Sequence, residues 1–294
     1  MTSSVLPLSV IFLTYNAEAS IEVGLKSVAG WVGEIFVVDS GSTDNTLGIV
    51  ARYTDNIVFH PFDNYAQQRN WAQENLPLSY DWVFHIDADE WVTSELRAAL
   101  EAFFHSDGVA ATHGLLIKRR TVFLGRWIKH GGHYPSYHMR VFRHEHGQCE
   151  ERLYDQHFVV AGPIRRLEGG DLIDCVTSDL DTWVMRHIRW AGLEVQEILN
   201  RQSAAKPDVH VKPRATGNLI ERRRWARVAL YNRLPLFVRS TVYFIYRYFF
   251  RLGFLDGSEG LIFHVLQGFW FRFYIDARLW EVRHAGDSVD GRHG

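Results

Sequence analysis

The first hundred residues alternate between short apolar runs and amphipathic stretches, and this alternation limits the possible folds more than any other feature. Continuous apolar runs at Leu8–Leu13 and Trp82–Ile86 have the length and composition of buried strands. Strands and helices that alternate through short links predict an α/β fold, with a mostly parallel sheet flanked by helices. The expected elements are strands at 8–13, 34–38, 57–59 and 82–86, and helices at 17–31, 43–53, 64–75 and 94–104.

Polar residues follow three of these strands at the point where each strand ends. In parallel sheets, ligands bind beyond the carboxyl ends of the strands, so these residues are expected to form one site. They are Thr14, Tyr15 and Asn16 after the first strand, Asp39, Ser40 and Gly41 after the second, and Asp87, Ala88 and Asp89 after the fourth.

The fourth strand ends in two acids one residue apart, Asp87 and Asp89, which on an extended segment would point to the same side. A divalent cation that holds a nucleotide diphosphate needs oxygen ligands and offsets the charge of the departing diphosphate. The motif therefore predicts Asp87 and Asp89 as ligands of Mn²⁺ or Mg²⁺. The alternative is a turn in which Asp89 or Glu90 lies near the start of the helix at Ser94.

The second strand runs into Asp39, whose carboxylate can accept a hydrogen bond from a uracil imide or a ribose hydroxyl. Gly41 permits a tight turn, and Ser42 or Thr43 is expected to cap the following helix. The alternative is a loop with an Asx-type turn and no ligand. The segment is not G-x-G-x-x-G, so a dinucleotide-binding fold of the usual kind has no support.

The last third of the chain has a different composition. From Arg214 to Arg251 there are nine arginines and one acid, Glu221, interleaved with aromatic and aliphatic residues. This composition favours helices in a membrane interface, with arginine at headgroup level and aromatic residues below, and hence an anionic membrane surface as partner. The alternative is a helical subdomain whose aromatic residues form a core and whose arginines face water.

Composition narrows the remaining classes of protein. The formal net charge of -2 gives no indication of nucleic-acid binding. Two cysteines, Cys149 and Cys175, are too few for a disulfide framework and indicate a reducing compartment. The first apolar stretch has strand length and lacks a preceding Lys or Arg, and no run approaches about 18 apolar residues. We therefore expect a cytoplasmic protein bound peripherally to the inner face of the cell membrane.

Three segments in order, Leu8–Asn16, Val38–Asp44 and Asp87–Glu90, resemble family 2 glycosyltransferases. The segments 123–128, 131–135, 140–143 and 253–261 are similar to the branch that builds lipopolysaccharide core and surface polysaccharides. The resemblance implies a GT-A fold, an inverting mechanism, Mn²⁺ or Mg²⁺, and a nucleotide-diphosphate sugar donor, with UDP-hexose as the default. It also implies a lipid-linked, lipopolysaccharide or exopolysaccharide acceptor.

The same resemblance assigns roles to individual residues. Asp89 and Asp87 would bind the metal. The residues implied for the nucleotide sugar are Thr14, Asn16, Asp39, Ser40, Gln68, Arg69 and Asp87. Related proteins often carry Gln/Lys-Asn where this chain has Gln68 and Arg69.

An inverting transfer also needs a general base for the acceptor hydroxyl. The stretch 150–158 offers Asp155 first and Glu151 next, although it departs from the Val-His-Glu of many relatives. The alternative is an acid that only pairs with Arg152 or Arg143. The expected organisation is a nucleotide-sugar-binding and catalytic domain at 1–175, followed by a helical, acceptor- and membrane-associating region at 176–294.

Three other functions are weighed against this one. A sugar nucleotidyltransferase would need a Gly-rich, basic loop after the first strand, and Thr14–Glu18 is neither. A catalytically inactive membrane adaptor would have no need for the acids Asp39, Asp87 and Asp89. A glycosidase needs two acids on opposite faces of a sugar, which two acids on the same side of one strand cannot provide.

Overall fold

The computed structural model describes residues 5–176, 179–203, 211–217 and 219–284, and the chain divides into two compact units. The first unit contains Met1–Val122, Pro135–Glu151 and Gln156–Cys175. The second unit contains Phe123–Tyr134, Arg152–Asp155 and Val176–Gly294. The second unit thus combines the C-terminal part of the chain with two short segments from its middle.

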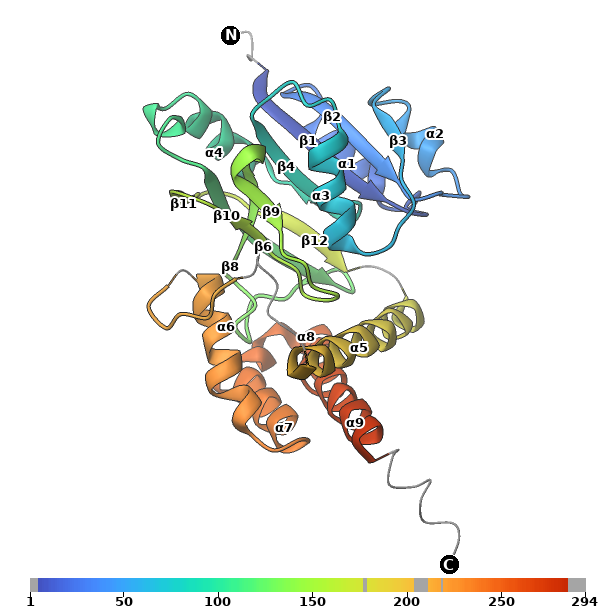
Figure 1. Ribbon diagram of the computed structural model, residues 1–294, viewed down its shortest axis with the longest axis vertical. Helices are drawn as coiled ribbons and strands as arrows, with labels where there is room; N and C mark the ends of the chain where they lie inside the picture. The colour runs from blue at the N-terminus through green and yellow to red at the C-terminus, as the bar shows by residue number, and fades with distance from the viewer. Residues whose placement is uncertain (1–4, 177–178, 204–210, 218, 285–294) are drawn as a thin grey trace, which may run out of the picture. The chain divides into compact units, whose positions relative to one another are not determined.

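The first unit is built on a mixed sheet with strand order β3-β2-β1-β4-β8-β6-β12-β5 (Figure 1). Its strands are β1 (Leu6–Thr14), β2 (Val32–Asp39), β3 (Ile57–Phe59), β4 (Trp82–Asp87), β5 (Glu90–Val92), β6 (Gly114–Phe123), β8 (Ser136–Arg143), β9 (Gly147–Cys149), β10 (Phe158–Val160), β11 (Ile164–Arg166) and β12 (Leu172–Val176). Its helices are α1 (Ile21–Val28), α2 (Thr46–Val50), α3 (Tyr65–Asn75) and α4 (Ser94–Phe104), with 3₁₀ turns η1 (Asp107–Val109) and η2 (His144–His146).

The four N-terminal strands form the parallel part of this sheet. β1 pairs with β2 and with β4 in parallel, and β2 pairs with β3 in parallel. The register places Thr14 opposite Asp39 and Leu13 opposite Asp87, so the carboxyl ends of the three strands lie side by side. Beyond β4 the pairs β4–β8, β8–β6 and β12–β5 are antiparallel, whereas β11 pairs with β6 in parallel.

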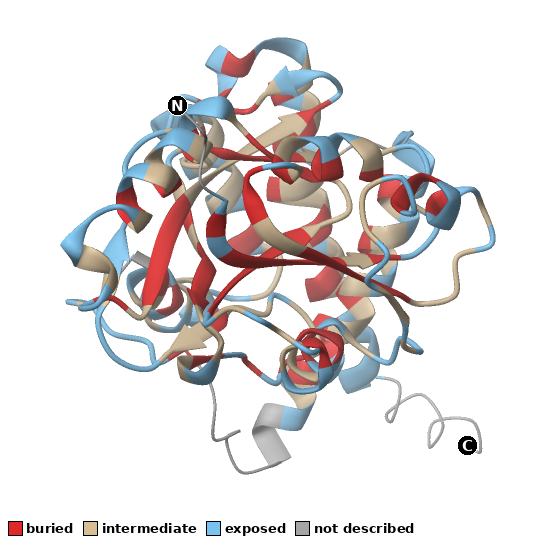
Figure 2. Ribbon diagram, turned by 90° about the horizontal axis from the view of Figure 1, so that it is seen from above, coloured by how far each residue is buried: buried red, intermediate tan, exposed pale blue. Residues whose placement is uncertain are grey.

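The two faces of the sheet are covered by different helices. Leu8, Val10 and Phe12 alternate along β1 and pack in one core with apolar residues of α1, α2 and α4. On the other face, His85 of β4 lies 3.0 Å from the amide oxygen of Gln73 on α3. Figure 2 shows buried residues along the strands and exposed residues on the surrounding helices and loops.

Most of the expected elements in this unit are present, with changes at their ends. The strand at Ile57–Phe59 and the helix at Ser94–Phe104 have the expected bounds. The α2 helix is shorter than expected, and its N-cap residue is Asn45 rather than Ser42 or Thr43. Ser42 fails as a cap because its hydroxyl donates a hydrogen bond to Asp39 instead.

The second unit is helical. Its elements are β7 (Arg126–Trp127), α5 (Leu180–Ser203), α6 (Leu219–Ala229), α7 (Val238–Ile245), α8 (Gly257–Phe263) and α9 (Phe271–His284), with η3 (Tyr231–Arg233), η4 (Tyr246–Phe250), η5 (Gly253–Asp256) and η6 (His264–Trp270). One core joins α5 and α9 through Ala191, Val195, Phe271 and Ile275. Among the described residues, no helix is both long and apolar enough to span a bilayer.

The arginines of this unit do not all lie at its surface. Arg224 of α6 and Arg239 of α7 are buried, and Arg239 Nε donates to Asp276 Oδ1 at 2.7 Å. The expectation that these arginines face water or lipid headgroups is therefore wrong for Arg224 and Arg239. Many of the apolar side chains between Val238 and Val265 are exposed instead.

Candidate active site

The candidate site is built at the carboxyl edge of β2, β1 and β4. Thr14 ends β1, Asp39 ends β2 and Asp87 ends β4, and the parallel pairing brings the three together. The Thr14 side chain is 4% exposed, and its hydroxyl has no hydrogen-bond partner among the described residues. A buried hydroxyl is normally hydrogen-bonded, so this orphan group is consistent with a ligand at the edge.

Asp39 organises the loop that follows β2. One carboxylate oxygen accepts the backbone N–H groups of Gly41 and Ser42, each at 2.8 Å. The other oxygen accepts the Ser42 hydroxyl at 2.5 Å. The Asx-type turn considered from the sequence is therefore present, with Gly41 at φ +94°, which glycine adopts without strain.

The loops after β1 and β2 are locked together by side-chain hydrogen bonds. Asn16, at φ +47°, accepts the Thr43 N–H at 2.8 Å. Gln68 of α3 donates to the Ser40 hydroxyl at 3.2 Å and lies 2.7 Å from Nδ1 of His60. The structure thus places the expected nucleotide-binding residues Asn16, Ser40 and Gln68 in one network around the strand ends.

Asp87 is held between two arginines. Arg69 of α3 donates to one carboxylate oxygen at 2.9 Å, and Arg140 of β8 donates to the other at 2.8 Å. Arg140 also donates to buried Glu90 at 2.8 Å. Sequence reasoning missed Arg140 and Glu90 as members of the site. Their one sequence signal is that both lie in segments shared with the resembling family.

The pKa values of the two acids that Arg140 contacts, Asp87 and Glu90, are shifted in opposite directions. Burial acts to raise the pKa of Asp87, but Arg140 and Arg69 outweigh it and hold that pKa well below its usual range. Burial dominates at Glu90 and raises its pKa to about 8, against the lowering effect of Arg140. Burial, together with both arginines, also lowers the pKa of His85 well below its usual value.

The acid motif does not have the extended geometry assumed from the sequence. β4 ends at Asp87, and Ala88 and Asp89 form a turn before β5 begins at Glu90. The premise that Asp87 and Asp89 point to the same side of a strand is therefore wrong. The turn does not start the next helix either, because Thr93 is the N-cap of α4 and accepts the Leu96 N–H.

The donor set fits a divalent cation only in part. Both carboxylate oxygens of Asp87 already accept arginine hydrogen bonds, whereas Asp89 is half-buried in the turn at the strand end. Within the described ranges, no group of three or more His, Cys, Asp or Glu side chains could hold a metal by itself. One carboxylate together with substrate phosphates and water is enough for Mg²⁺.

The two candidate bases differ in their surroundings. Glu151, in the first unit, is exposed, and no described side chain pairs with its carboxylate. Asp155 belongs to the second unit, has a positive φ of 57°, and pairs with Arg227 at 3.1 Å. Their neighbour Glu150 is buried and accepts the His157 N–H at 3.1 Å, an arrangement that the sequence pattern did not reveal.

A parallel half-sheet with acids at its strand ends, extended by antiparallel strands that supply a buried arginine, defines a GT-A-like fold. Comparison with known sequences identifies the particular group. The sequence model described as Glycosyl transferase family 2 matches residues 9–158, just over half of the 294-residue chain. The chain belongs to this family.

Two curated relatives illustrate the similarity. The chain is 27% identical over 199 residues to the lipopolysaccharide core biosynthesis glycosyltransferase LpsC of Rhizobium meliloti (strain 1021), covering 65% of this chain and 72% of the relative. It is 35% identical over 99 residues to the uncharacterized glycosyltransferase RC0292 of Rickettsia conorii, covering 34% of each chain. The chain thus matches about a third of the length of that second relative.

Solved structures give a more distant likeness. S. aureus TarS 1-349 in complex with UDP aligns over 95% of this chain and 91% of that chain, at 18% identity and a TM-score of 0.45. Glucosyl-3-phosphoglycerate synthase from Mycobacterium tuberculosis, in complex with Mg²⁺ and UDP, aligns over 40% of this chain and 44% of that chain, at 23% identity and a TM-score of 0.30.

Proposed function

We propose that this glycosyltransferase moves a hexose from a UDP-hexose, with inversion, to a lipid-linked, lipopolysaccharide or exopolysaccharide acceptor. The observation that carries the proposal is the convergence of Thr14, Asp39 and Asp87 at one sheet edge, inside the span that matches the family. The similarity to LpsC, a lipopolysaccharide core biosynthesis glycosyltransferase, supports a lipopolysaccharide acceptor.

The donor would lie across the three strand ends. The orphan hydroxyl of Thr14 and the loop that Asp39 and Asn16 hold would contact the nucleoside. Arg69 Nε and Arg140 Nη1 are buried and, among the described residues, without a hydrogen-bond partner. A diphosphate beside Asp87 would satisfy these donors, because guanidinium groups match phosphate oxygens in geometry and charge.

We propose that Asp89 binds Mn²⁺ or Mg²⁺. Asp87 instead holds Arg69 and Arg140 in place. Such a cation offsets negative charge on the leaving diphosphate. Asp87 keeps its negative charge because Arg69 and Arg140 favour it, so it anchors both guanidinium groups at the edge.

We propose Glu151, the second candidate from the sequence, rather than Asp155 as the general base. In an inverting transfer, the acceptor oxygen bonds to the anomeric carbon as the bond from that carbon to the diphosphate breaks. The base takes the proton of the acceptor hydroxyl. An exposed carboxylate without a partner can do this, whereas Asp155 is already engaged by Arg152 and Arg227.

The second unit carries a surface suited to a membrane. Exposed apolar side chains gather within a single stretch from α7 to α8, and Arg251 in that stretch is also exposed. Aromatic and aliphatic groups with neighbouring arginine are the chemistry of helices bound to an anionic interface. We name this stretch the apolar face: Val238, Val242, Ile245, Tyr246, Phe249, Phe250, Leu252, Phe254, Leu255 and Leu261.

The proposed donor site is tested by calorimetric binding of UDP, with GDP as comparison, in the presence and absence of Mn²⁺. The wild type is compared with Asp89→Ala and with Asp55→Ala, an exposed acid outside the site. We expect metal-dependent UDP binding that Asp89→Ala abolishes and Asp55→Ala retains. A folded wild type that binds no nucleotide under any condition would overturn the transferase proposal in favour of an inactive adaptor.

A further inference from the structure

Helix α3 is hydrogen-bonded to the edge of β9 through two of its side chains. Asn70 Nδ2 donates to the backbone oxygen of Cys149 at 3.0 Å, and Asn70 Oδ1 accepts the Cys149 N–H at 2.8 Å. Gln73, one turn further along α3, donates to the backbone oxygen of Gly147 at 2.8 Å. The side-chain amides of α3 thus take the place of a further strand beside β9.

The spacing of these contacts follows from the geometry of a helix and a strand. Residues three apart, such as Asn70 and Gln73, lie on one face of a helix. Residues two apart, such as Gly147 and Cys149, have backbone groups that face the same edge of a strand. The other edge of β9 pairs with β10, where Cys149 lies opposite Phe158. The helix therefore holds the β9–β10 hairpin in one register.

The same turn of α3 carries two residues of the candidate donor site. Gln68 donates to the Ser40 hydroxyl at 3.2 Å, and Arg69 donates to Asp87 at 2.9 Å. Because Arg69 and Asn70 are consecutive, this turn contacts both the acid at the end of β4 and the backbone of β9. Helix α3 therefore links the strand ends to the hairpin within the first unit.

Strand β9 leads directly to the proposed base. Cys149 ends the strand, and Glu150 and Glu151 follow it. Glu150 is buried, donates its N–H to the His157 carbonyl at 2.9 Å and accepts the His157 N–H at 3.1 Å. Since two residues of chain span at most about 7 Å, the backbone of Glu151 stays close to the contact that Asn70 makes.

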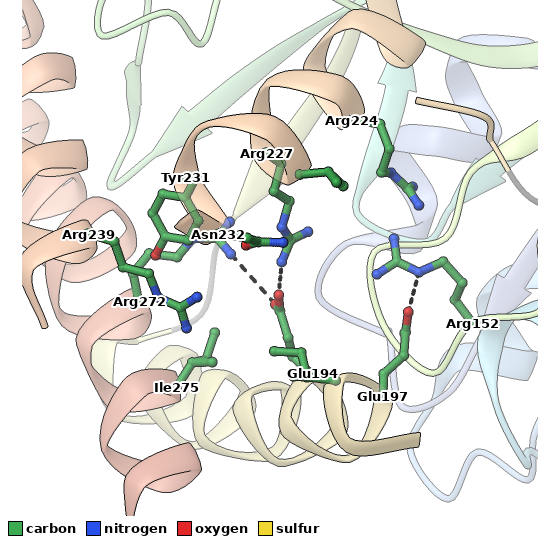
Figure 3. A pocket seen from close by; sticks show the side chains of 12 residues that line it. Arg152, Glu194, Glu197, Arg224, Arg227, Tyr231, Asn232, Arg239, Arg272 and Ile275 are labelled. Atoms are coloured by element: carbon green, nitrogen blue, oxygen red, sulfur yellow. Dashed lines mark hydrogen bonds and ion pairs between the residues drawn. The ribbon is translucent and has the colours of Figure 1, made fainter. Parts of the chain in front are cut away.

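The residue after Glu151 is also held, within the second unit. Arg152 is buried and lines a small cavity, where its Nε donates to Glu197 of α5 at 2.6 Å (Figure 3). Both chain neighbours of Glu151, Glu150 and Arg152, are therefore buried and hydrogen-bonded, whereas Glu151 itself is exposed. An exposed carboxylate on a backbone fixed in this way has little freedom of position.

We propose that Asn70 is a positioning residue, which fixes Glu151 relative to the donor site through its two hydrogen bonds with the backbone of Cys149. The inference rests on the proposed function, because it takes Glu151 as the base of an inverting transfer. A base acts only within hydrogen-bond reach of the acceptor hydroxyl, and a misplacement of about 1 Å can cost up to a hundredfold in rate. Loss of the Asn70 amide should therefore lower turnover while nucleotide binding persists.

The test compares the wild type with Asn70→Ala, Asn70→Asp, Glu151→Gln and the double variant that combines Asn70→Ala with Glu151→Gln. Asn70→Asp keeps the acceptor for the Cys149 N–H and loses the donor to the Cys149 carbonyl. Asn75→Ala is the matched control, because Asn75 is exposed on the same helix.

Three measurements are made on each protein. Initial rates of UDP release are recorded with UDP-glucose and with UDP-galactose, and a lipopolysaccharide extract serves as acceptor. Calorimetry gives the affinity for UDP, and thermal unfolding establishes that each variant is folded. If Asn70→Ala does not fold, Asn70→Asp takes its place in every comparison.

We expect Asn70→Ala to lower kcat at least about tenfold, Asn70→Asp to lower it less, and Asn75→Ala to leave it unchanged, with UDP affinity retained in all three. In the Glu151→Gln background, Asn70→Ala should lower kcat no further, because the group that it positions is already absent. A merely structural role would give the same loss in both backgrounds, and that result would overturn the proposal.

The same experiment separates this inference from the proposed function. A folded wild type that turns over neither donor would refute the proposed function and this inference with it. Full kcat in Glu151→Gln would refute the choice of base, and hence a role for Asn70 through that base. A reduced kcat in Glu151→Gln with an unchanged kcat in Asn70→Ala would leave the proposed function standing and overturn the positioning role alone.

Discussion

At the scale of single residues, Arg140 joins the two buried acids of the site. It donates to Asp87 and to Glu90, each at 2.8 Å, from a buried position. Removing one partner of a buried ion pair leaves an uncompensated charge, so Arg140→Gln is expected to lower the free energy of unfolding by about 3–5 kcal/mol. Arg140→Lys should lose less, because it keeps the charge while losing the fork geometry.

Urea unfolding provides the measurement, with Arg97→Gln as the control. Arg97 forms a partly exposed pair with Glu101 on α4, and such pairs contribute about 1 kcal/mol or less. Equal losses for Arg140→Gln and Arg97→Gln would show that the cluster at Asp87 is not a buried ionic unit.

The choice of base is also decided at the residue scale. Glu151→Gln removes the proton acceptor and is expected to reduce kcat by at least about a hundredfold while UDP affinity stays unchanged. Asp155→Asn should affect stability more than kcat, because Asp155 pairs with Arg152 and Arg227. Initial rates with a UDP-hexose and an acceptor extract decide between them. A larger loss of kcat in Asp155→Asn, with normal stability, would reverse the assignment.

At the scale of elements, Thr93 fastens the start of α4. Its hydroxyl oxygen accepts the N–H of Leu96 at 3.2 Å and that of Asp171, just before β12, at 3.0 Å. Thr93→Ala is expected to cost about 1–2 kcal/mol, because it removes an N-cap and a second hydrogen bond. Thermal unfolding should show that Thr93→Ser retains most of the stability and that Ser94→Ala, beside it, changes little. No difference between Thr93→Ala and Ser94→Ala would contradict this role.

The elements that the sequence predicted well are those whose pattern is local. The run Leu8–Phe12 is buried on both faces, and Ile21, Leu25 and Val28 are buried at helical spacing. The extent of α2 was overestimated because Ser42 hydrogen-bonds to Asp39 instead of capping the helix. A side chain that chooses between two local partners cannot be assigned from spacing alone.

The candidate site could likewise be predicted only where local patterns determine it. Strand ends place Asp39 and Asp87 at one edge, because parallel strands share a direction. Arg140 reaches Asp87 only because β8 pairs with β4 antiparallel, at a sequence separation of more than fifty residues. Hydrophobic periodicity contains no information about such pairing. Only the family resemblance, which covers the segments that hold Arg140 and Glu90, could have pointed to these two residues.

At the scale of the whole molecule, one buried histidine makes stability depend on pH. His264 is buried, and its ring nitrogens have no hydrogen-bond partner within the described part of the chain. The groups that face it include Arg247, Asp256, His133 and Tyr248. Burial, and next Arg247, lowers the pKa of His264 to about 4. The unfolded chain, with a usual pKa of about 6.5, then binds more protons between these two values.

The contribution of His264 to stability is therefore expected to be complete above about pH 6.5 and to fall, by on the order of 3 kcal/mol, as the pH decreases toward 4. His264→Leu removes the proton-binding group and should unfold with a smaller difference between pH 7 and pH 5. Differential scanning calorimetry at both values provides the comparison. Identical pH dependence in the two proteins would show that His264 does not contribute.

The apolar face also bears on how the whole molecule behaves, because exposed apolar side chains are unfavourable in water. The net charge of the chain is only -2, so overall charge does not prevent its approach to an anionic membrane. Phe250 is 75% exposed on the apolar face, and Phe59, 66% exposed in the first unit, offers a matched control. Burying a phenylalanine in lipid is worth roughly 1.5–3 kcal/mol, so Phe250→Ser should weaken vesicle binding about tenfold or more.

Flotation with anionic liposomes should show this loss for Phe250→Ser but not for Phe59→Ser. Added salt should weaken binding of the wild type, because arginine contributes beside the apolar groups. Recovery of the wild type only in the soluble fraction would refute membrane binding, and equal losses in both variants would place the contact elsewhere than the apolar face.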